Sequence, residues 1–115
     1  MNPLYVFIGG GLGSVLRWGV GQWLDPVGTL AVNLIGSAVL AFLAHPDMGI
    51  VGPWKLALCV GLMGGFTTYS TFNLEVLKAL QDGNGQRAVA LMAATLLGAL
   101  AAGALGWSLA GRVAG

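Results

Sequence analysis

Residues 88–111, AVALMAATLLGALAAGALGWSLAG, form the longest stretch of the chain without a charged side chain. A helix needs about 20 predominantly apolar residues to cross the hydrocarbon core of a bilayer, so this segment is long enough to span a membrane. Two further uncharged stretches, 26–44 and 56–74, have a similar length, and residues 1–24 contain a single charged side chain, that of Arg17. The sequence therefore predicts several membrane-spanning helices.

The composition of the whole chain agrees with this interpretation. Its 115 residues are 57% hydrophobic and 8% charged, and the mean hydropathy is +0.83. Because soluble domains carry about 25% charged residues, five Lys and Arg with four Asp and Glu are too few to solvate a soluble fold. The net charge of +1 offers no basic patch for nucleic acid, and a single cysteine, Cys59, excludes an intrachain disulfide. We expect one all-α integral membrane domain over residues 1–115.

Turn-forming residues divide the chain into four predicted helices. Asp25-Pro26 ends the first apolar stretch, proline and glycine cluster over residues 45–53, and the sequence QDGNG occupies residues 81–85. Clusters of Pro, Gly, Asn and Asp are typical of turns. We expect four transmembrane helices, at roughly residues 3–24, 27–44, 53–80 and 86–112.

The positive charges hardly favour one orientation in the membrane. With four spans, Lys55 and Arg112 lie on one side and Arg17, Lys78 and Arg87 on the other, and the excess of Lys and Arg is what normally selects the cytoplasmic side. Either one stray charge or the lipid decides the orientation, or copies insert both ways and pair antiparallel. We expect such an antiparallel dual-topology dimer, because four short helices enclose little volume for a polar pathway.

Twenty glycines are compatible with membrane helices that pack closely. Small residues spaced four apart lie on one helix face and let two backbones approach each other. We expect helix–helix contacts at the residues with this spacing, which are Gly9, Gly13, Gly61, Gly65, Gly98, Ala102 and Gly106.

The third predicted helix contains a segment, GGFTTYSTF at residues 64–72, that suits a membrane helix poorly. Its Ser and Thr side chains can bond back to the preceding turn and bend the helix. Alternatively the helix is broken near the bilayer centre, which is tolerated where the backbone is buried or lines a cavity. We expect a break, and the carbonyls that it frees can form a site for a hard cation. In an antiparallel pair, two such breaks can meet on the two-fold axis.

Three further side chains within the predicted spans, an amide and two charged groups, are candidates for a functional role. Asn33 either makes a hydrogen bond between helices or presents its NH₂ group to a pore. Arg17 either extends to a lipid headgroup or faces a water-filled vestibule. Glu75 precedes Lys78 by three residues, so the two can form a solvated pair on one helix face.

Three motifs follow one another along the chain: GGGLGSVLRW at 9–18, GTLAVNLIG at 28–36 and GGFTTYSTF at 64–72. Together, in a four-span chain this short, they resemble the CrcB/Fluc family of fluoride-specific ion channels over essentially the whole length. The resemblance implies a dual-topology homodimer with two antiparallel pores. Some members of the family work as a pair of different subunits, so a paralogue is an alternative partner.

The resemblance also implies a structural Na⁺ ion at the centre of the dimer, where the broken third helices of the two copies meet. By motif position, its ligands are the backbone carbonyls of Gly64 and Thr67 from each copy. The ion is expected to hold the two chains together and not to be transported.

The family motifs assign further residues to the ion pathway. The family's paired phenylalanines fall on Tyr69 and Phe72, so a tyrosine replaces the first of them. The residues implied to line the fluoride pathway are Asn33, Tyr69, Ser70, Thr71 and Phe72. The residues implied to lie at the pore entrance are Arg17 and Glu75.

The resemblance implies passive export of fluoride from the cytoplasm across the cell inner (plasma) membrane, which reduces fluoride toxicity. The pathway side chains offer neutral NH and OH donors, and aromatic edges carry partial positive charge. Such groups can replace the water of a small, tightly hydrated anion without trapping it, while a narrow rigid passage excludes the larger chloride.

Three other classes of function fit the sequence less well. A small multidrug exporter that is coupled to protons needs a carboxylate buried in the first span, and no Asp or Glu precedes Asp25. A purely structural membrane protein explains the glycines but gives no reason for Asn33 or for the hydroxyl groups of residues 64–72. An enzyme lacks support, because the sequence suggests no nucleophile–base pair, paired carboxylates or metal-ligand cluster.

Overall fold

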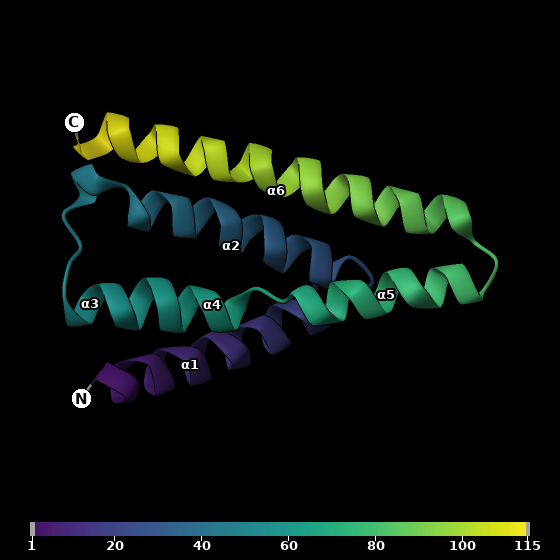
Figure 1. The fold of residues 1–115 in the computed structure, drawn as a ribbon, viewed down its shortest axis with the longest axis horizontal. Helices are drawn as coiled ribbons and strands as arrows, with labels where there is room; N and C mark the ends of the chain where they lie inside the picture. The colour runs from purple at the N-terminus through teal and green to yellow at the C-terminus, as the bar shows by residue number, and fades with distance from the viewer. Residues whose placement is uncertain (1, 115) are drawn as a thin grey trace.

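The computed structural model, which describes residues 2–114, consists of helices joined by short connections. Four long helical segments lie side by side (Figure 1). The first, second and last are single helices, α1 (Asn2–Trp23), α2 (Gly28–Ala44) and α6 (Gly85–Ala114). The third is composite and contains α3 (Pro53–Lys55), the π-helix η2 (Leu56–Leu62), α4 (Met63–Phe66) and α5 (Tyr69–Gln81). A 3₁₀ turn, η1 (Pro46–Met48), follows α2.

The helix ends lie within two residues of the ranges expected from the sequence, and the turn chemistry explains their positions. Asn84 precedes α6, and its Oδ1 accepts a hydrogen bond from the Arg87 N–H at 3.0 Å, as an N-cap residue does. Gly49, Gly52 and Gly83 have positive φ values of 69°, 64° and 74°. These values favour glycine because it has no Cβ.

The helices differ in how well they suit a membrane span. Within α6, Gly85–Val113 is long and apolar enough to cross a bilayer, and it is the one described helix that meets both conditions. α2 is apolar but has 17 residues, which corresponds to about 26 Å at 1.5 Å per residue. That the four segments all cross a membrane stays a prediction.

Glycines bring the helices into backbone contact. A methyl group at Gly9 or Gly13 of α1 would collide with backbone oxygens of η2, and one at Gly65 would collide with the Gly10 carbonyl. A methyl group at Gly106 of α6 would collide with a backbone oxygen of α2. The expectation that small residues mark helix–helix contacts is confirmed at these positions.

The interior of a single chain is small. One buried cluster consists of Val32, Met63 and Phe66, and another of Val76, Ala79 and Ala88. Many large apolar side chains are instead exposed, including Phe7 at 78% and Trp23 at 82%. Exposed apolar surface of this extent indicates contact with lipid or with another protein chain.

The two ends of the bundle carry different connections. The first turn of α1, the last turn of α6 and the connection from α2 to α3 lie at one end, and the α5–α6 connection lies at the other (Figure 1). At the first of these ends, the His45 imidazole packs on Trp107, with 4.4 Å between ring centroids. This contact attaches the end of α2 to α6.

Candidate functional site

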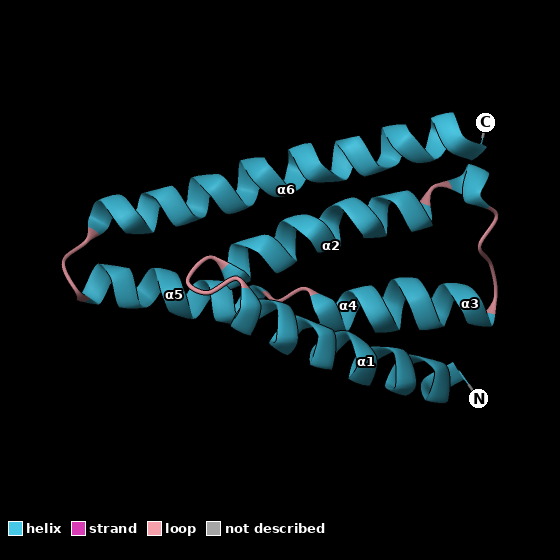
Figure 2. Ribbon diagram, turned by 180° about the vertical axis from the view of Figure 1, so that it is seen from behind, coloured by secondary structure: helices cyan, strands magenta, loops and turns pink. Residues whose placement is uncertain are grey.

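The backbone between α4 and α5 leaves the helical conformation for two residues. Thr67 has φ −87° and ψ 157°, and Thr68 has φ −147° and ψ 122°, so both are extended. Figure 2 shows this segment as a loop between the two helices. Thr68 then starts α5, because its Oγ1 accepts a hydrogen bond from the Thr71 N–H at 3.3 Å.

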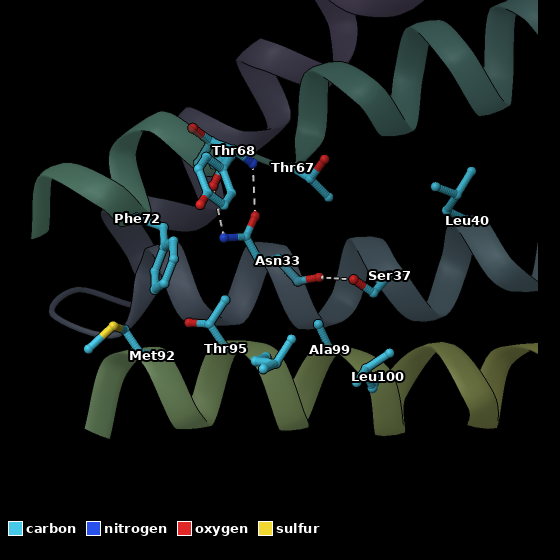
Figure 3. Close-up of a pocket in the computed structure, with 12 residues that line it drawn as sticks. Asn33, Ser37, Leu40, Thr67, Thr68, Phe72, Met92, Thr95, Ala99 and Leu100 are labelled. Carbon is cyan, nitrogen blue, oxygen red and sulfur yellow. Dashed lines mark hydrogen bonds between the residues drawn. The ribbon is translucent and has the colours of Figure 1, made fainter. Parts of the chain in front are cut away.

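Asn33 of α2 binds this extended segment through both ends of its side-chain amide. Its Nδ2 donates to the Thr68 carbonyl at 2.9 Å, and its Oδ1 accepts from the Thr68 N–H at 2.8 Å (Figure 3). The side chain is buried, with 8% exposure. Of the two roles left open by the sequence, the structure therefore shows the hydrogen bond between helical segments. One N–H of the amide is used in this way, and an asparagine amide has two.

A groove of about 640 Å³ lies beside the extended segment, between α2, α5 and α6. Its lining combines hydroxyl and amide groups with apolar and aromatic side chains (Figure 3). The polar residues are Asn33, Ser37, Thr67, Thr68 and Thr95. The others are Leu40, Tyr69, Phe72, Met92, Leu96, Ala99 and Leu100.

The residues expected in the fluoride pathway divide into two groups. Asn33, Tyr69 and Phe72 line the groove, whereas Ser70 and Thr71 do not. The rings of Tyr69 and Phe72 meet edge to face, with 5.7 Å between centroids. Tyr69 is 74% exposed, so most of its ring surface is free to contact something outside the chain.

Arg17 lies apart from this groove and contacts backbone of the third segment instead. Its Nε donates to the Gly65 carbonyl at 3.0 Å. Gly65 is in the last turn of α4, where helix carbonyls lack their usual partners and carry partial negative charge. The guanidinium group is therefore held at a helix C-terminus. The two roles expected for Arg17 from the sequence did not include this contact.

Glu75 pairs with a hydroxyl group and not with a cation. Thr29 Oγ1, in the first turn of α2, donates to Glu75 Oε2 at 2.6 Å. Within residues 2–114, no ion pair joins Glu75 to Lys78, so the structure does not contain the pair that their spacing allows. The carboxylate instead turns toward α2, where it gains a direct hydrogen bond.

Comparison with known proteins identifies the family. The family model described as "CrcB-like protein, Camphor Resistance (CrcB)" matches residues 4–107, which is most of the chain. This chain belongs to the CrcB family. The family expected from the three sequence motifs is therefore confirmed.

Several relatives of this CrcB chain carry the name fluoride-specific ion channel FluC. The protein from Serratia proteamaculans is 46% identical over 110 residues, which are 84% of each chain. The protein from Pectobacterium carotovorum is 42% identical over 117 residues, covering 92% of this chain and 91% of the relative. The one named FluC 2 from Moorella thermoacetica is 40% identical over 121 residues, covering 98% and 99%.

Four polar residues of the site were missed as site residues by the sequence analysis of this CrcB chain, and one of them is Thr68, the partner of Asn33. The other three are Thr29, Ser37 and Thr95. Thr29 binds Glu75, Ser37 Oγ donates to the Asn33 carbonyl at 2.7 Å, and both Ser37 and Thr95 line the groove. Thr29, Asn33 and Ser37 are spaced four apart and so share one face of α2. That spacing was visible in the sequence, and it marks a polar stripe on an otherwise apolar helix.

Proposed function

We propose that this chain forms a fluoride-specific ion channel that lets fluoride leave the cytoplasm passively and so reduces its toxicity. The observation that carries this proposal is its membership of the CrcB family, with relatives of 40–46% identity that are named fluoride-specific ion channels. Conduction of this kind is not an enzymatic reaction. With the cell interior negative, the membrane potential drives anion efflux with about 2.3 kcal/mol per charge for each 100 mV.

The composition of the groove supports a pathway for a small anion. Its polar groups are neutral hydroxyls and an amide, which can donate hydrogen bonds without adding a fixed charge that would trap the ion. The edges of the Tyr69 and Phe72 rings carry partial positive charge. In this proposal the pathway consists of Asn33, Tyr69, Phe72 and the neighbouring hydroxyls of Ser70 and Thr71, and Arg17 and Glu75 lie toward its entrance.

We propose an antiparallel homodimer as the conducting unit. The groove is open along one side of a single chain, and Tyr69 at its edge is largely exposed. A second copy can close it and satisfy the Tyr69 hydroxyl inside the membrane. The nearly balanced positive charges at the two ends support insertion in both orientations. A paralogous chain is the alternative partner, because relatives in Moorella and Yersinia carry the numbered names FluC 2 and FluC 1.

The proposed location is the inner membrane, with four spans. Trp54, in α3, and Trp23, the last residue of α1, are 70% and 82% exposed. Tryptophan is enriched at both membrane–water interfaces. Their positions support a bundle that is embedded lengthwise in the bilayer, with the extended segment of the third helix near its middle.

A structural Na⁺ ion is proposed at the centre of the dimer, bound by the Gly64 and Thr67 carbonyls of each copy. The donor set fits, because Na⁺ is a hard cation and backbone carbonyls are hard oxygen ligands. Outside its neighbours and the backbone of its own helix, no described heavy atom lies within 4 Å of a methyl group placed on Gly64, so that side of α4 is open to a partner. Bound there, the ion would link the two chains electrostatically.

Flux measurement in liposomes tests the proposed function. Purified protein, reconstituted in liposomes whose potential is clamped by a potassium ionophore, is expected to release fluoride and to retain chloride. A fluoride electrode and a chloride electrode provide the measurement, and empty liposomes are the control. Fluoride release no faster than in empty liposomes would contradict a channel made of this chain alone. Release that appears only after coexpression with a paralogue would support the two-subunit form.

A further inference from the structure

The hydrogen bonds of Asn33 replace one bond that a continuous helix would contain. In an α-helix each N–H donates to the carbonyl four residues earlier, so the Thr68 N–H would reach the Gly64 carbonyl. In the structure this N–H donates to Asn33 Oδ1 at 2.8 Å, and the Thr68 carbonyl accepts from Asn33 Nδ2 at 2.9 Å. The side chain of α2 therefore takes the place of the helical partner on the Thr68 side.

The close approach of α2 that this bond needs depends on a glycine. Gly36 lies one turn from Asn33, and a methyl group added to it would collide with the Thr67 side chain. Ser37 Oγ donates to the Asn33 carbonyl at 2.7 Å, within the same turn of α2. Asn33 is thus held against the extended segment by packing as well as by its own hydrogen bonds.

The backbone carbonyls at the end of α4 differ in whether they accept a hydrogen bond. Arg17 Nε occupies the Gly65 carbonyl at 3.0 Å, and Met63 O accepts from the Thr67 N–H at 3.1 Å. The Gly64 carbonyl, which lies between them, loses its helical donor to Asn33. Gly64 is also exposed and has open space where a side chain would be.

We infer that Asn33 is a positioning residue for the cation site: its amide holds the Thr68 N–H away from the Gly64 carbonyl and so leaves that oxygen free to bind Na⁺. This inference rests on the proposed function, and it adds a role for Asn33 that is separate from donation to fluoride. In this role Asn33 does not touch the ion. It prevents the Thr68 N–H from donating a helical hydrogen bond to the Gly64 carbonyl, which is the proposed Na⁺ ligand.

The test measures the Na⁺ dependence of thermal unfolding, which needs no fluoride flux. A ligand that binds only the folded protein raises the unfolding midpoint as its concentration rises. The purified dimeric protein is titrated with NaCl at constant ionic strength, with N-methyl-D-glucamine chloride as the replacement salt. For Asn33→Ala, we expect the midpoint of the Na⁺ response to move to about 10- to 100-fold higher concentration, as is typical when a residue that orients a metal ligand is removed.

Two further variants complete the test. Asn33→Ser keeps a polar group, but its side chain is too short to bridge both Thr68 atoms. It is therefore expected to shift the midpoint of the Na⁺ response as Asn33→Ala does, and it carries the test if the alanine variant does not fold. Ser108→Ala is the control: it also removes one hydroxyl group, but from an exposed position on α6 outside the groove, and it is expected to keep the wild-type response.

The outcomes separate this inference from the proposals on which it rests. A folded Asn33→Ala or Asn33→Ser protein with the wild-type Na⁺ response would overturn the positioning role and leave the proposed sodium site intact. A wild-type protein that conducts fluoride but shows no response to Na⁺ would overturn the sodium site and this inference with it. Absence of fluoride flux from a protein that still responds to Na⁺ would contradict only the channel function.

Discussion

At the scale of single residues, the unusual polar side chains of this chain act mainly on backbone atoms. Asn33 binds Thr68 and Arg17 binds Gly65, across sequence separations of 35 and 48 residues. In the hydrocarbon region a backbone group without a partner costs several kcal/mol, so a break in a helix has to be compensated by side chains from other helices. Asn33 and Arg17 provide that compensation on the two sides of the break.

Asn33→Asp should abolish fluoride flux. The substitution places a negative charge in the groove. It also puts a carboxylate oxygen next to the Thr68 carbonyl, which in the wild-type chain accepts a hydrogen bond from Asn33 Nδ2 at 2.9 Å. The negative charge repels an anion, and the contact between the two oxygens disturbs the extended segment. We expect release in the liposome assay to fall to that of empty liposomes, while Ser108→Ala, which lies outside the groove, retains flux. Wild-type flux in Asn33→Asp would mean that Asn33 is not part of the pathway.

At the scale of helices, contact between backbones determines how the segments pack. α2 packs extensively along α6, and α1 packs against η2 and α4. These contacts involve glycines because membrane helices gain little from burying apolar side chains that lipid already solvates, and so depend on close packing. How well each glycine tolerates substitution by alanine therefore depends on the atoms that it faces.

Gly106→Ala should destabilise the folded chain by about 1–3 kcal/mol, the usual cost of an overpacked contact. The added methyl group would collide with the backbone of Ala38, so α2 and α6 must separate. Unfolding by SDS in mixed micelles gives the change in free energy.

Gly64→Ala is the matched control for that substitution, because a methyl group at Gly64 would meet nothing within 4 Å outside its neighbours and the backbone of its own helix. It should leave the stability of one chain nearly unchanged and, under the proposed dimer, weaken association of the two copies. Equal destabilisation by the two substitutions, measured in monomeric protein, would contradict the packing seen at Gly106.

At the scale of the whole molecule, a single chain leaves its groove open and much of its apolar surface exposed. Its groove is open, its interior is small, and large apolar side chains such as Phe7 and Trp23 are exposed. Lipid can cover the apolar surface, but a polar groove that opens into lipid would expose its hydroxyls to hydrocarbon. The second copy of the chain in the proposed dimer would resolve this conflict.

Labelling of single cysteines should detect both orientations in cells. In a Cys59→Ala background, a membrane-impermeant thiol reagent should label about half of an Asp82→Cys protein from outside, because the positive charges hardly bias insertion. Arg112→Cys, near the opposite end of the bundle, should also be about half labelled. Complete labelling at one position and none at the other would show a single orientation and contradict the antiparallel dimer.

The helices and their ends were predictable from the sequence, because uncharged stretches and turn residues are local signals. The three motifs also identified the family, and Asn33 and residues 64–72 stood out because polar groups are costly in an apolar helix. Local signals cannot identify partners, however. The sequence therefore suggested Lys78 for Glu75, whereas the structure shows Thr29 of another helix.

What the sequence by itself determined is thus the set of helices, the apolar environment that they require and the residues that are out of place there. Only the tertiary structure decided that the Asn33 amide binds both backbone groups of Thr68 and that Arg17 binds the Gly65 carbonyl. The physical reason is that hydrogen-bond partners are chosen by distance in space. Those distances depend on where glycines such as Gly9, Gly36 and Gly106 let the helices meet.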